Sequence, residues 1–412
     1  MSSARLPSGP SAGRQAGARR SAAPNSQREM RQRNLSRVLY AVAEAGRISR
    51  ASAATRIGLT RGAVSTLVEE LLRSGLLDEL GPGHSSGVGR PGSALTLPDR
   101  GPCGLGAEIG VDHLTVCAVD LRGETRARAA ADLTHPQPAS EAAARLRVLV
   151  REVADAVAPQ GLRPAGLTVA VPGTVERGGT TVVHAPNLDW HGVDLAHHLG
   201  DDLPLTVENE ANLGALAELW IGEGRAAHSA LRDFVRVSAE VGVGAGLVLD
   251  GELLRGTRGF AGEFGHVPVR PEGAECACGG RGCLEQYAGA AAVLRTADVT
   301  ATEGGEARRL LTVRAEAGDT AALHALHEAG TALGTALAGA VNLLDPRAVV
   351  LGGALADFGE WVLPPVEREL GRRTAARGAS VELCVSPLGA DAALLGAAHA
   401  EVRRVLDAPL SL

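Results

Sequence analysis

GHVPVRPEGAECACGGRGCLE, residues 265–285, is the stretch of this 412-residue chain with the most specific chemistry. One histidine and three cysteines occur at a density that matches a tetrahedral, four-ligand zinc site. The four ligands would be His266, Cys276, Cys278 and Cys283. Gly279, Gly280 and Gly282 let the loop fold back so that the thiolates can reach one ion. We therefore expect a structural Zn²⁺ with no open position for catalysis. The alternative is a surface loop of reduced thiols, which would be open to oxidation.

This stretch resembles the signature of the ROK family (repressors, open reading frames and kinases), whose members are bacterial sugar kinases and sugar-sensing repressors. The resemblance runs from about residue 28 almost to the C-terminus. It implies an α/β chain with a two-lobed sugar-kinase fold of the actin-like, ribonuclease H-like type at residues 101–408. A winged helix-turn-helix in front of that domain, at residues 28–100, is similar to the repressor branch and is absent from most of the kinases.

The resemblance also implies where a sugar would bind. In the family the zinc-binding histidine points a ring nitrogen at the sugar, and acidic residues on either side of the cluster take sugar hydroxyls. The matching positions are Glu263, His266 and Glu285, with further contacts from Gly173, Asn187, Asn209 and Glu210. Carboxylates and an imidazole whose tautomer a metal fixes suit a ring of hydroxyls. Without the resemblance, exposed salt bridges would be the default interpretation of the two flanking glutamates.

The pattern of apolar residues after position 104 also favours an α/β arrangement. Short apolar runs bounded by glycine turns predict strands, and stretches such as 141–158 and 209–220 predict helices between them. The predicted strands cover residues 105–109, 114–120, 166–171, 235–238, 246–249 and 348–351. A mixed sheet with helices on both faces, in two lobes about a cleft, is the simplest arrangement. The apolar stretch 329–344 is short and rich in Ala and Gly, which predicts a core helix and not a membrane span.

Two departures from the kinase pattern argue against phosphoryl transfer. Active members have Asp-x-Gly-Gly-Thr at the turn that approaches the nucleotide phosphates, whereas this chain has EIGVD at 108–112, with Val111 where backbone must lie close to phosphate. The resemblance places the catalytic Asp at Glu210. A general base must lie roughly 2.6–3.2 Å from the atom whose proton it removes. The added methylene of glutamate displaces the carboxylate by roughly 1.5 Å, which is large compared with this range. A second glycine-rich stretch, VGVGAG (241–246), keeps its glycines but lacks the family's Thr. LGG (351–353) resembles the family's adenosine-side turn and is expected to serve only packing. We expect no enzymatic activity.

The N-terminal residues carry the pattern of a helix-turn-helix. An apolar stripe predicts a first helix that ends at Gly46, Ser49 can cap a second helix over 50–56, and Thr60 can cap a third. The third helix has small polar residues and arginine near its start, as a major-groove recognition helix does. The candidate DNA-binding residues are Thr60, Arg61, Ser65, Thr66 and, in a glycine-rich loop, Arg90. Predicted strands 76–80 and 94–97 flank that loop and would form a wing. The alternative is a helical docking module with a disordered loop.

Net charge and cysteine content limit which partners and which cellular compartment are expected. The first 100 residues have 15 Arg and seven acidic residues, a balance of +8, although the whole chain has a formal charge of −6. The remainder therefore carries −14, which suits a small neutral ligand better than a polyanion. Residues 1–27 offer almost nothing to bury and are predicted to be a disordered arm. The cysteine spacing is not that of a disulfide framework, and no signal-peptide pattern is visible, so we expect a cytoplasmic protein.

These patterns predict a sugar-responsive, DNA-binding transcriptional repressor with a non-catalytic, kinase-like sensor domain. Its expected partners are double-stranded operator DNA, a small sugar effector and further copies of the same chain, in a homodimer or tetramer. Its expected cofactor is structural Zn²⁺. One alternative is an ATP-dependent sugar kinase that also binds DNA. A second alternative is a regulator controlled by a partner protein instead of a sugar.

Overall fold

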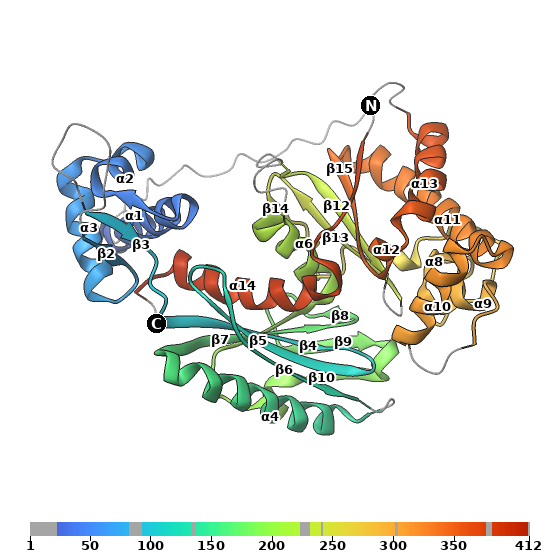
Figure 1. Ribbon diagram of the computed structural model, residues 1–412, viewed down its shortest axis with the longest axis horizontal. Coiled ribbons are helices and arrows are strands. Elements are labelled where there is room, and N and C mark those ends of the chain that lie inside the picture. Colours follow the sequence, from blue (N-terminus) through green and yellow to red (C-terminus); the bar gives the residue numbers. More distant parts are fainter. Residues whose placement is uncertain are drawn as a thin grey trace, which may run out of the picture.

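The computed structural model has three parts, namely an N-terminal helical domain and two lobes that are each built on a five-stranded sheet (Figure 1). The structure describes residues 23–81, 93–133, 137–222, 231–239, 242–300, 304–375 and 381–410. Within these ranges, no helix is both long enough and apolar enough to cross a bilayer.

The N-terminal domain is a winged helix-turn-helix, as the sequence predicts. Its helices and strands are α1 (Ala23–Ala45), β1 (Ile48–Ser49), α2 (Arg50–Ile57), α3 (Arg61–Arg73), β2 (Asp78–Leu80) and β3 (Ala94–Thr96). The strands are antiparallel in the order β1-β3-β2. The Ser49 side chain caps α2 and the Thr60 side chain caps α3, which confirms both predicted caps. Gly58, at φ +69°, ends α2 in the left-handed conformation and makes the short turn into α3.

The start of α1 and the ends of the wing differ from the expected boundaries. α1 begins at Ala23, so residues 23–27 are helical where the sequence predicted a disordered arm. Proline is compatible with the first helical turn, and no glycine interrupts the helix after Pro24. Strand β2 begins two residues later than predicted, and Leu76 and Leu77 before it are buried in the domain core. Arg90 lies outside the described residues, as do the rest of the predicted loop at 82–92 and residues 1–22.

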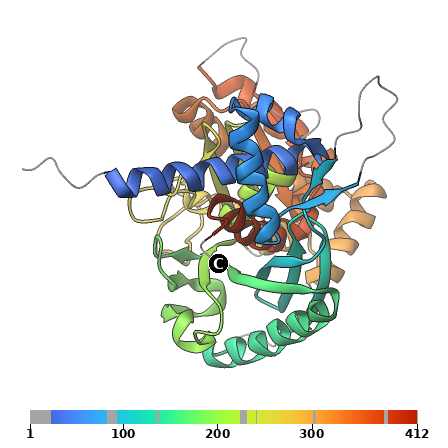
Figure 2. The same ribbon diagram turned by 90° about the vertical axis from the view of Figure 1, so that its left-hand side faces the viewer.

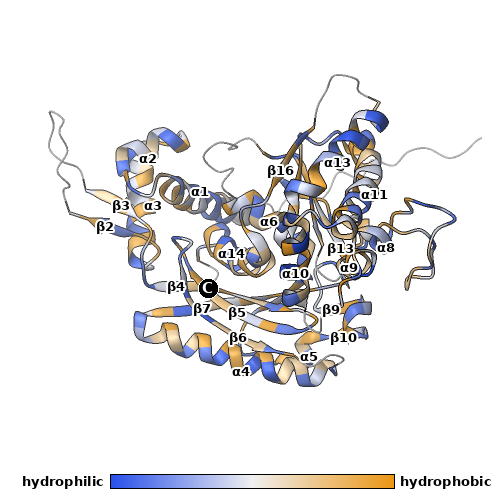
Figure 3. Ribbon diagram, turned by 45° about the vertical axis from the view of Figure 1, so that its right-hand side comes forward, coloured by the Kyte–Doolittle hydropathy of each residue, from blue (hydrophilic) through white to orange (hydrophobic). Residues whose placement is uncertain are grey.

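The first lobe is a mixed sheet with one helix on each face. Across the sheet its strands are β11 (Leu205–Asn209), β7 (Leu162–Val171), β4 (Gly101–Ile109), β5 (His113–Asp120) and β6 (Thr125–Asp132). The first three strands are parallel, and the last two form antiparallel pairs with their neighbours. α4 (Ala139–Val157) covers one face and α14 (Ala392–Asp407) covers the other (Figure 1). Figure 3 shows hydrophobic and hydrophilic residues alternating along α4, because only one side of this helix faces the sheet.

A small antiparallel sheet follows β7 and was not predicted. Its strands, in order, are β10 (Trp190–Asp194), β9 (Thr181–Ala185) and β8 (Thr174–Val175), and the short helix α5 (Leu195–Leu199) follows it. The one-turn 3₁₀ helix η2 (Pro186–Leu188) joins β9 to β10 and carries Asn187. Strands of two to five residues are too short for alternation of apolar and polar residues to identify them.

The second lobe has its own mixed sheet, so the core contains two large sheets where we expected one. Its strands are β14 (Glu252–Leu253), β13 (Val243–Leu249), β12 (Phe234–Ala239), β15 (Ala348–Gly353) and β16 (Glu382–Val385). The helices of this lobe are α8 (Glu285–Ala288), α9 (Ala290–Thr296), α10 (Gly304–Glu316), α11 (Thr320–Leu344), α12 (Ala354–Asp357) and α13 (Gly359–Arg373). The apolar stretch 329–344 forms the second half of α11 and packs in the lobe's core, as predicted.

Two helices lie between the sheets, and one of them also holds the N-terminal domain. α6 (Glu210–Ile221) packs on α14 and on β13, while α14 packs on β4 and β7. In Figure 2 the N-terminal domain faces the viewer, and the last turns of α14 (dark red) lie against its helices (blue). Val402, Val405 and Leu406 of α14 belong to the same buried apolar cluster as Leu39 and Leu71 of the N-terminal domain.

Candidate functional site

The four predicted metal ligands lie together. The ligand atoms of His266, Cys276, Cys278 and Cys283 are all within 4.8 Å of one another. Sγ of Cys276 is 3.8 Å from Nδ1 of His266, and the Sγ atoms of Cys278 and Cys283 are 3.7 Å apart. A tetrahedron with zinc–sulfur bonds of about 2.3 Å has edges of about 3.8 Å. The donor set and its spacing therefore fit one tetrahedral metal ion.

Backbone hydrogen bonds and one glycine shape the loop that carries the cysteines. The amide of Cys276 donates to the carbonyl oxygen of Gly280 at 2.9 Å. Gly282 has φ +68°, and an added Cβ would lie 1.6 Å from the carbonyl oxygen of Arg270, so only glycine fits there. A backbone hydrogen bond at Gly280 lowers the pKa of the Cys278 thiol, which favours the thiolate that binds a metal.

His266 presents one ring nitrogen to the cysteines and the other to an acidic side chain. Its Nδ1 faces Cys276, and its Nε2 lies 3.9 Å from Oε2 of Glu263. Partial removal from water raises the pKa of Glu263, the imidazole of His266 opposes this rise, and the nearby carboxylate of Glu285 adds to it. A metal on Nδ1 would leave the proton on Nε2, which could then donate to a ligand beside Glu263.

The other flanking glutamate and Asn187 converge on the start of β13. Oε2 of Glu285 accepts a hydrogen bond from the amide of Val243 at 3.3 Å. An added Cβ at Gly242 would lie 2.4 Å from this oxygen and 3.4 Å from Nδ2 of Asn187. The metal loop also reaches this point, because an added Cβ at Gly265 would lie 2.4 Å from the carbonyl oxygen of Val243. Side chains from both lobes therefore meet beside the metal cluster.

Asn209 and Gly173 bind each other on the first lobe. Nδ2 of Asn209 donates to the carbonyl oxygen of Gly173 at 2.8 Å, while its Oδ1 caps α6 by accepting from the amides of the next turn. Gly173 has φ +119°, and an added Cβ would lie 2.4 Å from the carbonyl oxygen of His184, so the position requires glycine. Glu210 is the half-buried first residue of α6. Hydrogen bonds within the fold thus already engage Asn209 and Gly173, and their sugar contacts stay predictions.

An ion pair between the lobes adjoins Asn209 and was missed in the sequence. Glu208 is the residue before Asn209, and its Oε2 lies 2.7 Å from Nε of Arg255 in the second lobe. Its Oε1 accepts from the amide of Asn209 at 3.1 Å and from Nδ2 of Asn212 at 2.9 Å. One carboxylate therefore links the cap of α6 to the opposite lobe. The partners are 47 residues apart, so no local pattern could have indicated the pair.

The turn that the resemblance assigns to nucleotide phosphates is closed by a histidine. The amide of Gly110 donates to the carbonyl oxygen of His113 at 2.9 Å, which makes a tight hairpin between β4 and β5. An added Cβ at Gly110 would lie 2.3 Å from the His113 ring, so the imidazole covers this glycine. Nδ1 of His113 is also 2.8 Å from a carboxylate oxygen of Asp112. The imidazole of His113 therefore lies directly against the backbone of this turn.

Packing explains the glycines in the two other glycine-rich stretches, VGVGAG (241–246) and LGG (351–353). An added Cβ at Gly244 would lie 2.9 Å from Cβ of Ala211 on α6, and one at Gly246 would lie 2.4 Å from Cβ of Ala215. At Gly352 it would lie 2.3 Å from the guanidinium of Arg236. Val241, the first residue of VGVGAG, lies outside the described residues.

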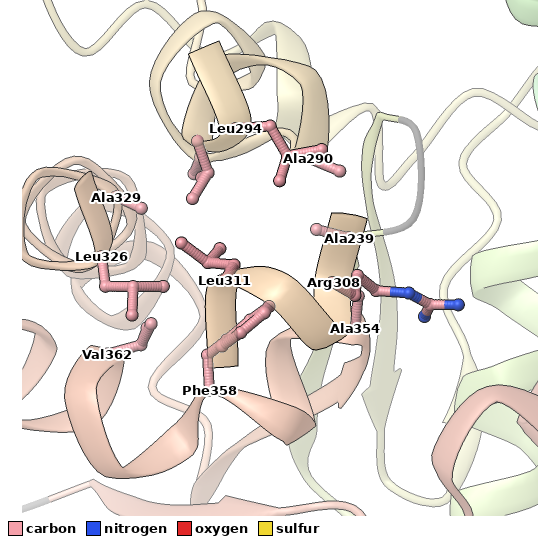
Figure 4. Close-up of a pocket in the computed structure, with 12 residues that line it drawn as sticks. Ala239, Ala290, Leu294, Arg308, Leu311, Leu326, Ala329, Ala354, Phe358 and Val362 are labelled. Atoms are coloured by element: carbon pink, nitrogen blue, oxygen red, sulfur yellow. The ribbon is translucent and has the colours of Figure 1, made fainter. Parts of the chain in front are cut away.

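A cavity lies next to the second of these turns (Figure 4). Its volume is only about 30 Å³, and eleven of its twelve lining residues have apolar side chains. Ala354, which follows the LGG turn, and Ala239, at the end of β12, both line it. Arg308 is the charged lining residue, and its guanidinium points away from the other labelled side chains (Figure 4). A cavity of this volume has room for one or two water molecules and not for a nucleotide base, and its lining offers few side-chain hydrogen-bond partners.

The recognition helix α3 presents its first turn to solvent. Arg61, Gly62 and Thr66 are exposed and Ser65 is half-buried. The opposite side of the helix is buried through Val64, Leu67, Val68 and Leu71. Gly62, in this first turn, has open space beside it, because nothing lies within 4 Å of an added Cβ.

Known proteins match both parts of the chain. The ROK family profile matches residues 104–402, and a profile described as winged helix-turn-helix DNA-binding matches residues 31–78. The xylose repressor of Caldicellulosiruptor bescii is 30% identical over 400 residues, 92% of this chain and 98% of that protein.

Two solved structures extend this similarity to three dimensions. A ROK family transcriptional regulator, a homolog of the E. coli MLC protein, has a TM-score of 0.76 and 25% identity, and the match covers 93% of this chain and 98% of that chain. A ROK family glucokinase from Streptomyces griseus, in complex with glucose and AMPPNP, has a TM-score of 0.62 and 28% identity over 72% of this chain and 98% of that chain. The chain belongs to the ROK family.

Proposed function

We propose that this chain is a transcriptional repressor whose binding to operator DNA is controlled by a sugar. One observation carries the proposal, which is that a winged helix-turn-helix and a sugar-kinase-like domain occur in one chain and share a buried cluster through α14. The similarity to a xylose repressor spans 92% of the chain, whereas the similarity to the glucokinase structure spans 72%.

The sugar would bind beside the metal loop, where side chains of both lobes meet. The contacts would come from Gly173, Asn187, Asn209, Glu210, Glu263, His266 and Glu285. A structural Zn²⁺ on His266, Cys276, Cys278 and Cys283 would orient the imidazole toward the ligand. One relative is a xylose repressor and one related structure is a complex with glucose, so an aldose is the effector class to test first.

The sensor would hold this sugar without phosphorylating it. His113 covers Gly110 in the turn assigned to the phosphates, and a glutamate, Glu210, stands where the family's catalytic base is an aspartate. The cavity next to the LGG turn is lined almost entirely by apolar side chains. An assay with ATP, Mg²⁺ and an aldose panel tests this part, since turnover of about 1–100 per second would identify a kinase instead.

DNA would be read by α3 in the major groove. Arg61 and Thr66, which are exposed, and Ser65, which is half-buried, would make base contacts, and Thr60 and Arg90 would add contacts beside them. A two-fold homodimer would place two such helices on half-sites one or more helical turns apart.

A mobility-shift titration with DNA from upstream of the chain's own coding region tests the proposal. We expect a retarded complex whose dissociation constant changes by about 5- to 150-fold when D-xylose or D-glucose is added, the usual range for coupling between two sites. Glycerol, a polyhydroxylated molecule without a ring, serves as the control. A retarded complex that no sugar alters would contradict control by sugar and would point to regulation by a partner protein.

Replacing Arg255 by Gln is expected to weaken sugar binding about three- to tenfold, while the free energy of unfolding falls by no more than about 1 kcal/mol. The ion pair with Glu208 is partly exposed and so contributes at most about 1 kcal/mol to stability, but it holds the carboxylate that positions Asn209. Calorimetric titration with the effector measures the change. Arg258→Gln, on the exposed part of the same loop, is the matched control. Equal effector affinities in the two variants would show that Arg255 does not support the sugar site.

A further inference from the structure

Control of DNA binding by a sugar requires a physical connection between the two sites, and one side chain of α14 lies between them. Arg403 is half-buried, and its guanidinium lies over two aromatic rings. Its Cζ atom is 4.9 Å from the centre of the Trp220 ring and 5.1 Å from the centre of the Tyr40 ring. Both distances lie within the range of about 6 Å for cation–π contacts. Trp220 belongs to the sensor domain and Tyr40 to the DNA-binding domain, so Arg403 joins the two.

Helix α6 ties Trp220 to the proposed sugar site. The helix is capped by Asn209, which also binds the carbonyl oxygen of Gly173, and Trp220 lies in its last turn. Twelve helical residues span about 18 Å. Since an α-helix moves as a stiff unit over such a length, a shift of its capped end on sugar binding also shifts Trp220.

A displacement of α6 must also displace α14, because the backbones of the two helices are in contact. An added Cβ at Gly396 of α14 would lie 2.0 Å from the carbonyl oxygen of Leu213 on α6. Seven residues separate Leu213 from Trp220, and seven separate Gly396 from Arg403. The helices therefore run side by side for two turns from the point of closest approach to the stacked side chains (Figure 1).

On the other side of the stack, Tyr40 is held by a second contact with α14. Its hydroxyl donates to Oδ1 of Asp407 at 2.8 Å. Burial raises the pKa of Tyr40 above its usual value, so the hydroxyl stays protonated and remains a donor. Leu39 and Val42, its neighbours on α1, belong to the buried cluster that also contains Leu67 of α3. A change in the position of Tyr40 is therefore passed through α1 to the recognition helix.

The stack crosses a groove, whereas the rest of this interface is a packed core. The groove between α1, α6 and α14 has a volume of about 960 Å³, and its lining includes Tyr40, Trp220, Arg403, Glu44, Arg122 and Glu218. Close-packed cores resist rearrangement, because side chains there interdigitate. Contacts across an open groove can be exchanged at lower cost, which makes the stack the part of the interface best suited to having two arrangements.

We propose that the stack of Tyr40, Arg403 and Trp220 couples the sugar site to the DNA-binding domain, a role that rests on the proposed function. In one arrangement Arg403 contacts both rings and fixes the orientation of α1. Sugar binding displaces Trp220 through α6, changes the contact with Arg403 and shifts the population of domain orientations. A ligand can shift such an equilibrium only by its different affinity for the two states, so removing the stack removes the shift while leaving each binding site intact.

Arg403→Met tests the stack, because methionine keeps much of the side-chain length but carries no charge. The measurement is the ratio of the DNA dissociation constants with and without saturating effector, D-xylose or D-glucose, on the full chain. We expect this ratio to fall from the wild-type value to less than about twofold. Sugar affinity of the free protein and DNA affinity without sugar should each stay within about threefold of wild type. Arg151→Met, on the exposed side of α4 behind the first-lobe sheet, is the matched control and should keep the wild-type ratio.

Two variants of Tyr40 keep the test decisive if Arg403→Met does not fold. Tyr40→Leu removes the ring and should abolish the response to sugar, whereas Tyr40→Phe keeps the ring, loses only the bond to Asp407 and should retain most of it. A wild-type ratio in the variants that lack the stack would overturn this inference and leave the proposed function standing. A ratio of one in the wild-type protein itself would contradict the proposed function, and the coupling role would fall with it.

Discussion

A Cys278→Ser variant is expected to lose its bound metal, and its free energy of unfolding should fall by about 3–5 kcal/mol, because a structural metal contributes directly to folding. Serine has nearly the same size as cysteine, but its hydroxyl is not among the ligands that structural zinc uses. The other contacts that hold the segment from Pro268 to Cys283 include two isolated β-bridges, backbone hydrogen bonds, and the ion pair of Arg270 with Glu328. Elemental analysis of the purified protein and urea unfolding measure the two effects.

The loss of metal should also abolish sugar binding, because the proposed ion would hold His266 beside Glu263. Cys384→Ser is the matched control, since Cys384 lies on β16 of the same lobe, away from the cluster, and this variant should keep one metal ion per chain. A full metal content in Cys278→Ser would contradict the ligand assignment. Unchanged sugar affinity after removal of the metal with a chelator would contradict the link between His266 and the ligand.

Features that depend on neighbouring residues could be read from the sequence. The turn between α2 and α3 is set by Ser49, Gly58 and Thr60, whose caps and left-handed backbone act within four residues, and the structure confirms both caps. The metal cluster is also local, because its cysteines lie within eight residues and glycines permit the required turns. Short-range chemistry of this kind does not depend on the rest of the fold.

Features that depend on contacts between distant segments could not be predicted. Glu208 and Arg255 lie on different lobes, and neither residue has a neighbour in sequence that indicates the pair. The sequence around Arg403 shows only an arginine on an amphipathic helix, because its contacts with the rings of Trp220 and Tyr40 arise from the fold. The division of the strands into two sheets likewise depends on which strands pair, and strand patterns alone do not specify the partner.

Glu285→Gln is expected to weaken effector binding about 10- to 100-fold, because a hydrogen bond to a charged group contributes about 1.5–3 kcal/mol. One carboxylate oxygen of Glu285 accepts from the amide of Val243, which leaves the other oxygen for a sugar hydroxyl. Glutamine has the same shape and can keep the bond to Val243 through its carbonyl oxygen, so the fold and the DNA affinity without sugar should not change. Calorimetric titration with the effector and a mobility shift without it measure the two expectations.

The control for this variant is Glu272→Gln, which makes the same change of charge on an exposed residue of the metal loop. A long-range effect of charge would weaken binding in both variants, because the two residues belong to the same segment of the second lobe. A direct contact predicts a loss in Glu285→Gln alone, since only that carboxylate lies beside Asn187 and the start of β13. Equal effector affinities in the two variants would therefore exclude Glu285 as a ligand contact and would place the sugar elsewhere between the lobes.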